Sequence, residues 1–459
     1  MPDDKTLTLR QADSLYQSFP DFSAWPAPKE DDLQLWDRFA SLLKETRKQA
    51  TPEALRNAVE VAVRAAAIDT GAIEGLYTVD RGFTMTVATQ ALAWEHALGE
   101  KGEKVRELFE AQLEAYELVI DAVTHKLSIS EAWIRALHEK VCAQQQTYRV
   151  LTDQGYQEQE FPKGSYKTQP NHVRLADGTL HSYAPVDRVS SEMYRLLEQI
   201  RTPEFESAHP VAQASYIHYV FVVIHPFADG NGRVARALAS VFFYRAHSIP
   251  FLVFANQRTS YFDALHQADL GQARPLLAFF LDRGIDTLQL VIDHLLTAEA
   301  PSPKRIAARI RLIDDVALRL LGAAKEQIRA QFDSLDLPIY LELYLEPTDN
   351  LMTSDQDYRQ VAGSTSLEVA IEDYEHEITS ETYITVLIAR DMTDPFPLCL
   401  IELDGSNDDL EARFEDVHPE ISENLRLRLK NWCGRFLGRV LKKYEERRPV
   451  PRERDESEK

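Results

Sequence analysis

The chain before residue 300 is dominated by apolar residues that recur at helical spacing. Apolar residues three or four positions apart form one face of an α-helix, so each such stretch predicts a helix that packs on a core. Two stretches are apolar on nearly every side and predict fully buried helices, Ile217–Ile224 and Val234–Phe243. The other predicted helices cover residues 33–48, 52–68, 84–100, 104–125, 129–146, 187–200 and 288–296.

The pattern changes after Pro301 and Pro303, which break any continuing helix. A helix is predicted over residues 305–335 and another over 425–440. Between them, apolar and polar residues alternate in four runs, 339–345, 367–371, 383–389 and 398–403. Alternation of period two predicts an antiparallel sheet with one solvated face. The chain is therefore expected to have a mainly α domain followed by a smaller α+β domain.

Two segments before residue 300 depart from the helical pattern. Ala176–Thr179 is a turn signal between two short apolar runs, and it predicts a β-hairpin near residues 173–183. An isolated hairpin is only marginally stable, so this one is expected to pack on something or to bind something. Ile68–Leu76 is expected to interrupt a helix, with Gly75 as its C-cap.

Composition narrows the classes of function. The formal net charge is −22, which argues against nucleic acid as a main partner because that binding rests on clustered cations. The three cysteines (Cys142, Cys399 and Cys433) are scattered without zinc spacing and are expected to be buried packing thiols. The N-terminal residues lack the pattern of a secretory signal, and no stretch approaches the roughly 20 apolar residues of a membrane span. We therefore expect a soluble, cytoplasmic protein without a membrane partner.

A polar, glycine-rich corner lies between the two predicted buried helices. A helix that starts after Gly230–Gly232 presents unpaired backbone N–H groups, which suit a phosphate. Arg233 and Arg236 place two guanidinium groups near the same opening, and Asp229 adds a hard oxygen ligand suited to Mg²⁺. His225 is a candidate general base. Each signal alone is weak, but their convergence over twelve residues predicts a phosphate-handling site.

These twelve residues, His-Pro-Phe-Ala-Asp-Gly-Asn-Gly-Arg-Val-Ala-Arg at 225–236, resemble the signature of the Fic family (filamentation-induced-by-cAMP), with every fixed position filled. Thr70–Gly75 resembles the inhibitory motif of that family, and the hairpin near 173–183 falls where the family has its target-docking flap. The resemblance covers roughly residues 55–295. It does not extend to the C-terminal region, where many relatives have a DNA-binding winged helix.

The resemblance implies a Fic-type helical bundle that transfers AMP from ATP to a protein Ser, Thr or Tyr hydroxyl and releases pyrophosphate. His225 would deprotonate the target hydroxyl, and Asp229 would hold Mg²⁺. The phosphates would be bound by Gly230, Asn231, Gly232 and Arg233, and the γ-phosphate by Arg236. Phe227 would anchor the loop in the core, and Asn256 and Tyr261 would approach the adenine.

The resemblance also gives Glu74 a role. Thr70 and Glu74 are four residues apart and share a face of any helical turn. A Glu74 carboxylate paired with Arg236 would occupy the guanidinium that the γ-phosphate needs, so Thr70, Glu74 and Gly75 are predicted to be regulatory. The enzyme is then expected to be largely inactive at rest and to modify itself when released.

The predicted organisation has four parts. They are an N-terminal arm and helix (1–50), a catalytic domain (51–297) with an inhibitory motif (70–75) and a flap (172–184), a C-terminal α+β domain of unassigned role (305–446) and a disordered tail (447–459). The target protein is expected to dock at the flap, and a homodimer is one arrangement that would suit this organisation.

Three alternatives stay open from the sequence. The same fold could use another nucleotide or phosphate-containing group, or remove AMP instead of adding it. The core could be a ligand sensor without catalysis, although the intact His225 argues against that. A transcriptional regulator is disfavoured by the net charge.

Overall fold

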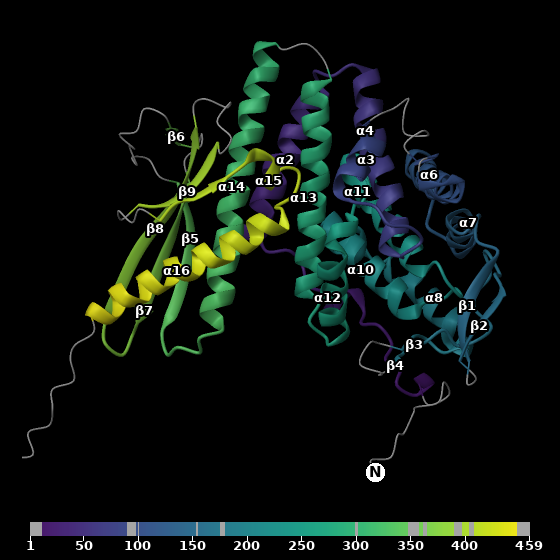
Figure 1. The fold of residues 1–459 in the computed structure, drawn as a ribbon. Helices are drawn as coiled ribbons and strands as arrows, with labels where there is room; N and C mark the ends of the chain where they lie inside the picture. Colours follow the sequence, from purple (N-terminus) through teal and green to yellow (C-terminus); the bar gives the residue numbers. More distant parts are fainter. Residues whose placement is uncertain are drawn as a thin grey trace, which may run out of the picture. The chain divides into compact units, whose positions relative to one another are not determined.

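The computed structural model describes residues 12–89, 98–99, 101–152, 155–174, 180–298, 302–347, 358–360, 365–389, 397–403 and 408–447. The chain divides into two compact units, Met1–Glu299 and Ala300–Lys459 (Figure 1). Among the described residues, no helix combines the length and the apolar character needed to cross a membrane.

The first unit is mainly helical, as the sequence predicted. Its helices are α2 (Glu30–Arg47), α3 (Pro52–Ile73), α4 (Arg81–Thr89), α6 (Glu103–Thr124), α7 (Glu131–Val141), α8 (Val189–Gln199), α9 (Pro203–Glu206), α10 (Pro210–Ile224), α11 (Asn231–His247), α12 (Arg258–Asp269) and α13 (Arg274–Thr297). Its strands form two antiparallel pairs, β1 (Thr147–Thr152) with β2 (Gly155–Glu160) and β3 (Val173–Arg174) with β4 (Leu180–His181).

Helices α10 and α11 form the centre of this unit. They pack against each other, α3, α6 and α7 contact α11, and α8 and α13 contact α10 (Figure 1). Nearly all of their side chains are buried, which is expected for helices that are apolar on every side. The short connection between them, residues 225–230, is thus held from both ends by the core.

An N-terminal segment packs onto this unit through its aromatic rings. Tyr16, Phe19, Phe22 and Trp25 are all buried. The Trp25 indole N–H donates to the Ser215 hydroxyl on α10. The described part of the predicted N-terminal arm, residues 12–29, therefore packs on the helical unit through its aromatic rings.

The structure corrects two predicted boundaries, and a third lies partly outside the described residues. Helix α3 continues through Ile73 instead of breaking at Ile68, because Gly71 lets the Tyr77 ring pack on the helix and donate to the Ile68 carbonyl. The helix predicted over 129–146 ends at Val141, and the chain then forms the β1–β2 hairpin, which was not predicted. The helix predicted over 84–100 is α4 up to Thr89, and residues 90–97 and 100 lie outside the described residues.

The second unit is the predicted α+β domain with an antiparallel sheet. Its helices are α14 (Pro303–Asp333), α15 (Phe414–Val417) and α16 (Glu423–Arg447). Its strands are β5 (Tyr340–Pro347), β6 (Tyr358–Gln360), β7 (Thr365–Asp373), β8 (Ile378–Ala389), β9 (Leu398–Glu402) and β10 (Leu410–Ala412). They follow the order β10–β9–β8–β7–β5, with β6 beside β8, and α14 and α16 pack on the sheet (Figure 1). The tail predicted to be disordered lies outside the described residues after Arg447.

Candidate active site

The loop between α10 and α11 has a backbone that few residues adopt. His225 ends α10 in the left-handed region with φ 51°, and Gly230 precedes α11 with φ 79°. A side chain at position 230 would be strained and would also place its Cβ 2.4 Å from the Cys142 sulfur, so glycine is required there. The loop therefore turns sharply and leads directly into the first turn of α11, where Gly232 is half-buried and its neighbours Asn231 and Arg233 are buried.

His225 is oriented by two contacts on its half-buried imidazole. Its Nδ1 lies 3.1 Å from the Val222 carbonyl oxygen, which only accepts, so Nδ1 carries the proton and Nε2 is the basic nitrogen. The Tyr183 ring, which directly follows β4, stacks on the imidazole at 3.8 Å between centroids. Burial, helped by the nearby charge of Lys167, lowers the pKa of His225 to about 3. The imidazole is therefore neutral near pH 7, the form that a general base needs.

Asp229 lies at the open side of the loop. Its carboxylate accepts hydrogen bonds from the Gly230 N–H at 2.6 Å and from the Gln145 amide at 3.2 Å. The side chain remains 44% exposed and lies 3.9 Å from Arg233 Nη2. An exposed carboxylate with spare lone pairs fits Mg²⁺, which is commonly held by one or two carboxylates together with substrate phosphates.

Asn231 and Phe227 stabilise the loop from inside. The Asn231 side chain accepts from the Phe227 N–H at 2.9 Å and donates to the Phe227 carbonyl at 2.8 Å. Phe227 is fully buried and stacks on His138 at 3.8 Å between centroids. The Asn231 side chain is thus committed to the loop, and only its backbone is available for the predicted phosphate contact.

His138 ties the loop to α7 and to the segment before β3. Its Nδ1 accepts from the Gly164 N–H at 2.9 Å, so its Nε2–H donates to the Asp229 carbonyl at 3.0 Å. Burial lowers the pKa of His138 to about 4, so this hydrogen-bonding pattern persists at neutral pH.

The two arginines of the loop are both buried at the start of α11. Arg233 Nη1 lies 3.5 Å from the Val141 carbonyl, whereas its Nε has no hydrogen-bond partner within the described part of the chain. Arg236 donates to the Thr70 hydroxyl at 2.8 Å, the Thr70 carbonyl at 3.1 Å and the Tyr261 hydroxyl at 3.3 Å. Burial works against its charge, but the Glu74 carboxylate holds the pKa of Arg236 above its usual value.

Glu74 closes the site from the end of α3. Its Oε1 lies 2.6 Å from Arg236 Nη2. The same oxygen would lie 2.4 Å from a Cβ added to Gly232, so the carboxylate rests against the first turn of α11. Gly75, with φ 73°, follows Glu74 and turns the chain away. Thr70 and Glu74 therefore both meet Arg236, which lies 166 and 162 positions further along the chain, and Gly75 ends the segment that carries them.

Several residues of this site lie far from the loop in sequence and were not identified from it. They are His138, Gln145, Lys167, Asn171, Tyr183 and His218. Tyr261, expected near the adenine, uses its hydroxyl to donate to His218 at 2.8 Å and to accept from Arg236, whereas Asn256 is exposed. No local pattern in the sequence places these side chains together, because they come from several separate segments of the chain.

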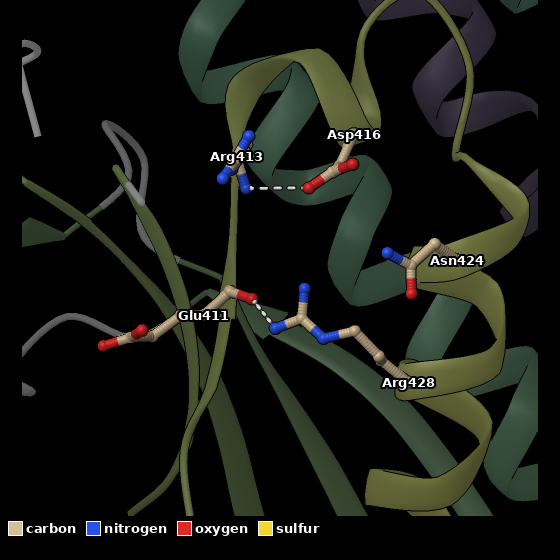
Figure 2. A pocket seen from close by; sticks show the side chains of 5 residues that line it. All are labelled: Glu411, Arg413, Asp416, Asn424 and Arg428. Atoms are coloured by element: carbon tan, nitrogen blue, oxygen red, sulfur yellow. Dashed lines mark hydrogen bonds between the residues drawn. The ribbon is translucent and has the colours of Figure 1, made fainter. Parts of the chain in front are cut away.

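The second unit has a shallow pocket of mixed charge lined by Glu411, Arg413, Asp416, Asn424 and Arg428 (Figure 2). Its groups largely satisfy one another: Arg428 donates to the Glu411 carbonyl, and the Arg413 N–H donates to Asp416. Throughout the described ranges, no group of three or more His, Cys, Asp or Glu is arranged to hold a metal ion. The loop of the first unit is thus the stronger candidate.

The fold and the loop together define a mainly helical unit in which a glycine-containing turn at the start of α11 lies beside a neutral imidazole. Residues 128–243 match the model of the Fic/DOC family. The segment that resembles a Fic domain therefore contains the loop.

Curated relatives carry the same family name. A stretch of 150 residues is 33% identical to "Protein adenylyltransferase Fic" of Drosophila persimilis and covers 33% of this chain and 28% of the relative. A stretch of 110 residues is 37% identical to the protein of that name in Aedes aegypti, covering 24% of this chain and 22% of the relative. The match thus spans 28% or less of the length of these two relatives.

Solved structures of Fic proteins also match. A Fic domain-containing signaling protein from Bacteroides thetaiotaomicron has a TM-score of 0.47 at 22% identity, over 60% of this chain and 100% of that one. Fic-1 from C. elegans has a TM-score of 0.43 at 21% identity, over 58% of this chain and 74% of that one.

Proposed function

We propose that this chain is a protein adenylyltransferase that transfers AMP from ATP to a hydroxyl group of a protein. The observation that carries the proposal is the position of a neutral His225 beside the first turn of α11, where Glu74 occupies Arg236. The name shared by the curated relatives supports AMP as the transferred group. The catalytic domain is proposed to be residues 51–297.

His225 acts as the general base in this proposal. Its Nε2 accepts the proton of the target hydroxyl while the hydroxyl oxygen forms a bond to the α-phosphorus of ATP. The bond from that phosphorus to the bridging oxygen breaks, and pyrophosphate leaves. The Nδ1–H bond to the Val222 carbonyl stabilises the imidazolium that forms, because it fixes the ring and remains a donor.

The start of α11 binds the phosphates. The backbone N–H groups of Gly230–Gly232 and the guanidinium groups of Arg233 and Arg236 supply donors and positive charge. Asp229 would hold Mg²⁺, which when bound neutralises charge on the phosphates. Arg233 Nε, unpartnered within the described part of the chain, is a donor available to a phosphate oxygen.

Glu74 holds the enzyme inactive in this proposal. Its carboxylate takes the Arg236 donor that the γ-phosphate needs and places negative charge against Gly232. ATP can then bind only with its γ-phosphate displaced, so the α-phosphorus is not aligned with the attacking hydroxyl. Activity requires that Glu74 leave Arg236.

The first experiment compares the wild-type protein with Glu74→Gly. With Mg-ATP, self-AMPylation of the variant is expected to rise about 10- to 100-fold, the usual range for a regulatory coupling of this kind. Mass spectrometry should show adenylyl adducts on Ser, Thr or Tyr, and His225→Ala in the same background should abolish them. A Glu74→Gly protein that binds ATP but forms no adduct would contradict the proposal and favour the sensor alternative.

The nucleotide is tested by the same variant. Calorimetry with ATP, GTP, UTP and CDP-choline separates the base preference from phosphate binding, which all four ligands share. ATP is expected to bind most tightly. If another of these ligands binds most tightly and its group is the one transferred, that group replaces AMP in the proposal.

The remaining assignments follow as proposals. The hairpin at 172–184 docks the target protein, since Tyr183 at its end contacts His225. The protein is cytoplasmic, in keeping with three free, buried cysteines. A homodimer is testable by light scattering of the purified chain.

A further inference from the structure

A segment of the chain runs alongside the catalytic loop. Tyr166 forms an isolated antiparallel bridge with Phe227. The backbone N–H of Lys167 donates to the Pro226 carbonyl at 2.8 Å. The loop therefore has a neighbouring strand-like segment, and the side chains of that segment lie next to His225.

Asn171 connects this segment to the backbone of His225. Its amide nitrogen donates to the Phe227 carbonyl at 2.7 Å and to the His225 carbonyl at 3.2 Å. The two hydrogens of one amide group thus join two carbonyls that are two residues apart. His225 has φ 51°, a left-handed conformation that is energetically costly for a residue with a side chain. The Asn171 amide offsets this cost by holding the carbonyls in the positions that the strained backbone gives them.

Lys167 fixes the orientation of that amide. Its Nζ donates to the Asn171 amide oxygen at 2.6 Å, and the residue is only 3% exposed. An amide turned over would place its oxygen against two carbonyl oxygens and its nitrogen against the Lys167 ammonium. Burial lowers the pKa of Lys167 to about 7, so the amine remains a donor in both of its forms.

We propose that Asn171 and Lys167 are positioning residues that hold His225 where its Nε2 can take the proton of the target hydroxyl. The inference rests on the proposed transferase function. It assigns no contact with ATP to either residue. Both amide hydrogen bonds end on the loop before Asp229, and the Phe227 carbonyl accepts from Asn231 as well as from Asn171. The phosphate-binding turn keeps a further contact without Asn171, because the Phe227 N–H donates to the Asn231 side chain.

This difference separates positioning from a general role in folding. Loss of the Asn171 amide should displace the imidazole but leave the start of α11 in place. The turnover number should then fall while the KM for ATP stays constant. A loosened fold would instead weaken ATP binding and lower the melting temperature together.

The test measures kcat and KM for ATP in the Glu74→Gly background. Asn171→Ala is expected to lower kcat about 100-fold, the scale of a 1 Å misplacement of a reacting group, with KM changed by less than about twofold. Asn171→Asp should lower kcat at least as much, because a carboxylate still accepts from Lys167 but repels both carbonyls. Lys167→Met should cause a smaller loss, and Lys167→Arg, which restores a donor, should recover part of it.

Asn57→Ala, on the exposed side of α3, is the matched control and should leave both constants unchanged. The inference would be overturned if Asn171→Ala kept a kcat within about twofold of that of its Glu74→Gly parent. It would also be overturned if Asn171→Ala raised the KM for ATP and left kcat unchanged. If the Glu74→Gly parent shows no activity, the proposed transferase function is contradicted instead.

A second measurement does not depend on transfer. The ring ¹⁵N chemical shifts of His225 can be assigned by comparison with His225→Ala. They should report the Nδ1–H tautomer alone in the Glu74→Gly parent and a mixture of the two tautomers when Asn171→Ala is added. Identical His225 shifts in the two proteins would overturn the inference even if no transfer is detected.

Discussion

At the scale of single residues, the site is built from side chains whose hydrogen bonds leave each a single function. His225 is kept neutral by burial and tautomerically fixed by the Val222 carbonyl. Asn231 is committed to the loop, so phosphate recognition falls to backbone N–H groups and arginines. Arg236 uses four of its five N–H donors on Thr70, Tyr261 and Glu74, and a phosphate can take the donor held by Glu74 only by replacing that carboxylate.

The low pKa of His225 predicts the pH dependence of the proposed reaction. A lowered pKa means that the base form is present at every pH above about 3, so His225 causes no loss near neutrality. At saturating Mg-ATP, the transfer rate of Glu74→Gly should change by less than about twofold from pH 7.5 to pH 6, whereas a histidine of ordinary pKa would cause about a fourfold fall. The transfer rate is measured as incorporation of radiolabel between pH 6 and pH 7.5, and the Glu74→Gly/His225→Ala variant gives the background. A rate that titrates near pH 6.5 would show that His225 is not buried as described.

At the scale of elements, the last turn of α3 is the regulatory part of the proposed enzyme. It carries Thr70 and Glu74 to Arg236 and is held by contacts that reach it from outside the helix. Tyr77 donates to the Ile68 carbonyl at 2.8 Å, and Arg258 of α12 donates to the Ile73 carbonyl at 2.8 Å. The position of Glu74 thus depends on how α3, the segment that carries Tyr77, and α12 pack together.

Gly71→Ala tests this dependence. A Cβ at this position would lie 2.3 Å from the Tyr77 hydroxyl, so the Tyr77 ring must move and release the turn. Self-AMPylation of the otherwise wild-type chain is expected to rise about five- to tenfold, a smaller release than in Glu74→Gly. Gly438→Ala on α16 is the matched control, because a Cβ there meets no atom within 4 Å and should only stabilise its helix by about 0.5–1 kcal/mol. If a folded Gly71→Ala protein shows unchanged self-AMPylation, the last turn of α3 does not regulate the enzyme.

At the scale of the whole molecule, a helical unit with the site is followed by a unit with an antiparallel sheet. The second unit carries a pocket lined by side chains of both charges, and its strand β5 alternates Leu with Tyr or Glu. The net charge of the whole chain is −22. These features describe a molecule that repels a polyanion overall.

The charge predicts the outcome of a DNA-binding test. In gel-shift experiments at about 100 mM salt, the full chain should not retard a DNA duplex at protein concentrations up to about 10 µM, because non-specific affinity depends on released counterions. Retardation that weakens as salt is raised would contradict this expectation and support the transcriptional alternative.

The sequence by itself determined the features that depend on neighbouring residues. Apolar spacing predicted α10 and α11 because a buried helix leaves its mark within a few turns. Alternation predicted the sheet strands β5, β7, β8 and β9 for the same reason. The loop from His225 to Arg236 was identified because its base, carboxylate, glycines and arginines are consecutive. Boundaries were less accurate where a tertiary contact overrode local preference, as Tyr77 does at Gly71.

Only the tertiary structure decided which distant side chains meet. The 2.6 Å contact of Glu74 with Arg236 agrees with the pairing that the family resemblance suggested, but its geometry against Gly232 depends on how α3 packs beside α11. Asn171 and Lys167 carry no local pattern that connects them to His225, because hydrogen bonds between separate segments leave no periodicity in either one. The chemistry of the loop was therefore readable from the sequence, whereas the groups that orient and restrain it became visible only once the chain was folded.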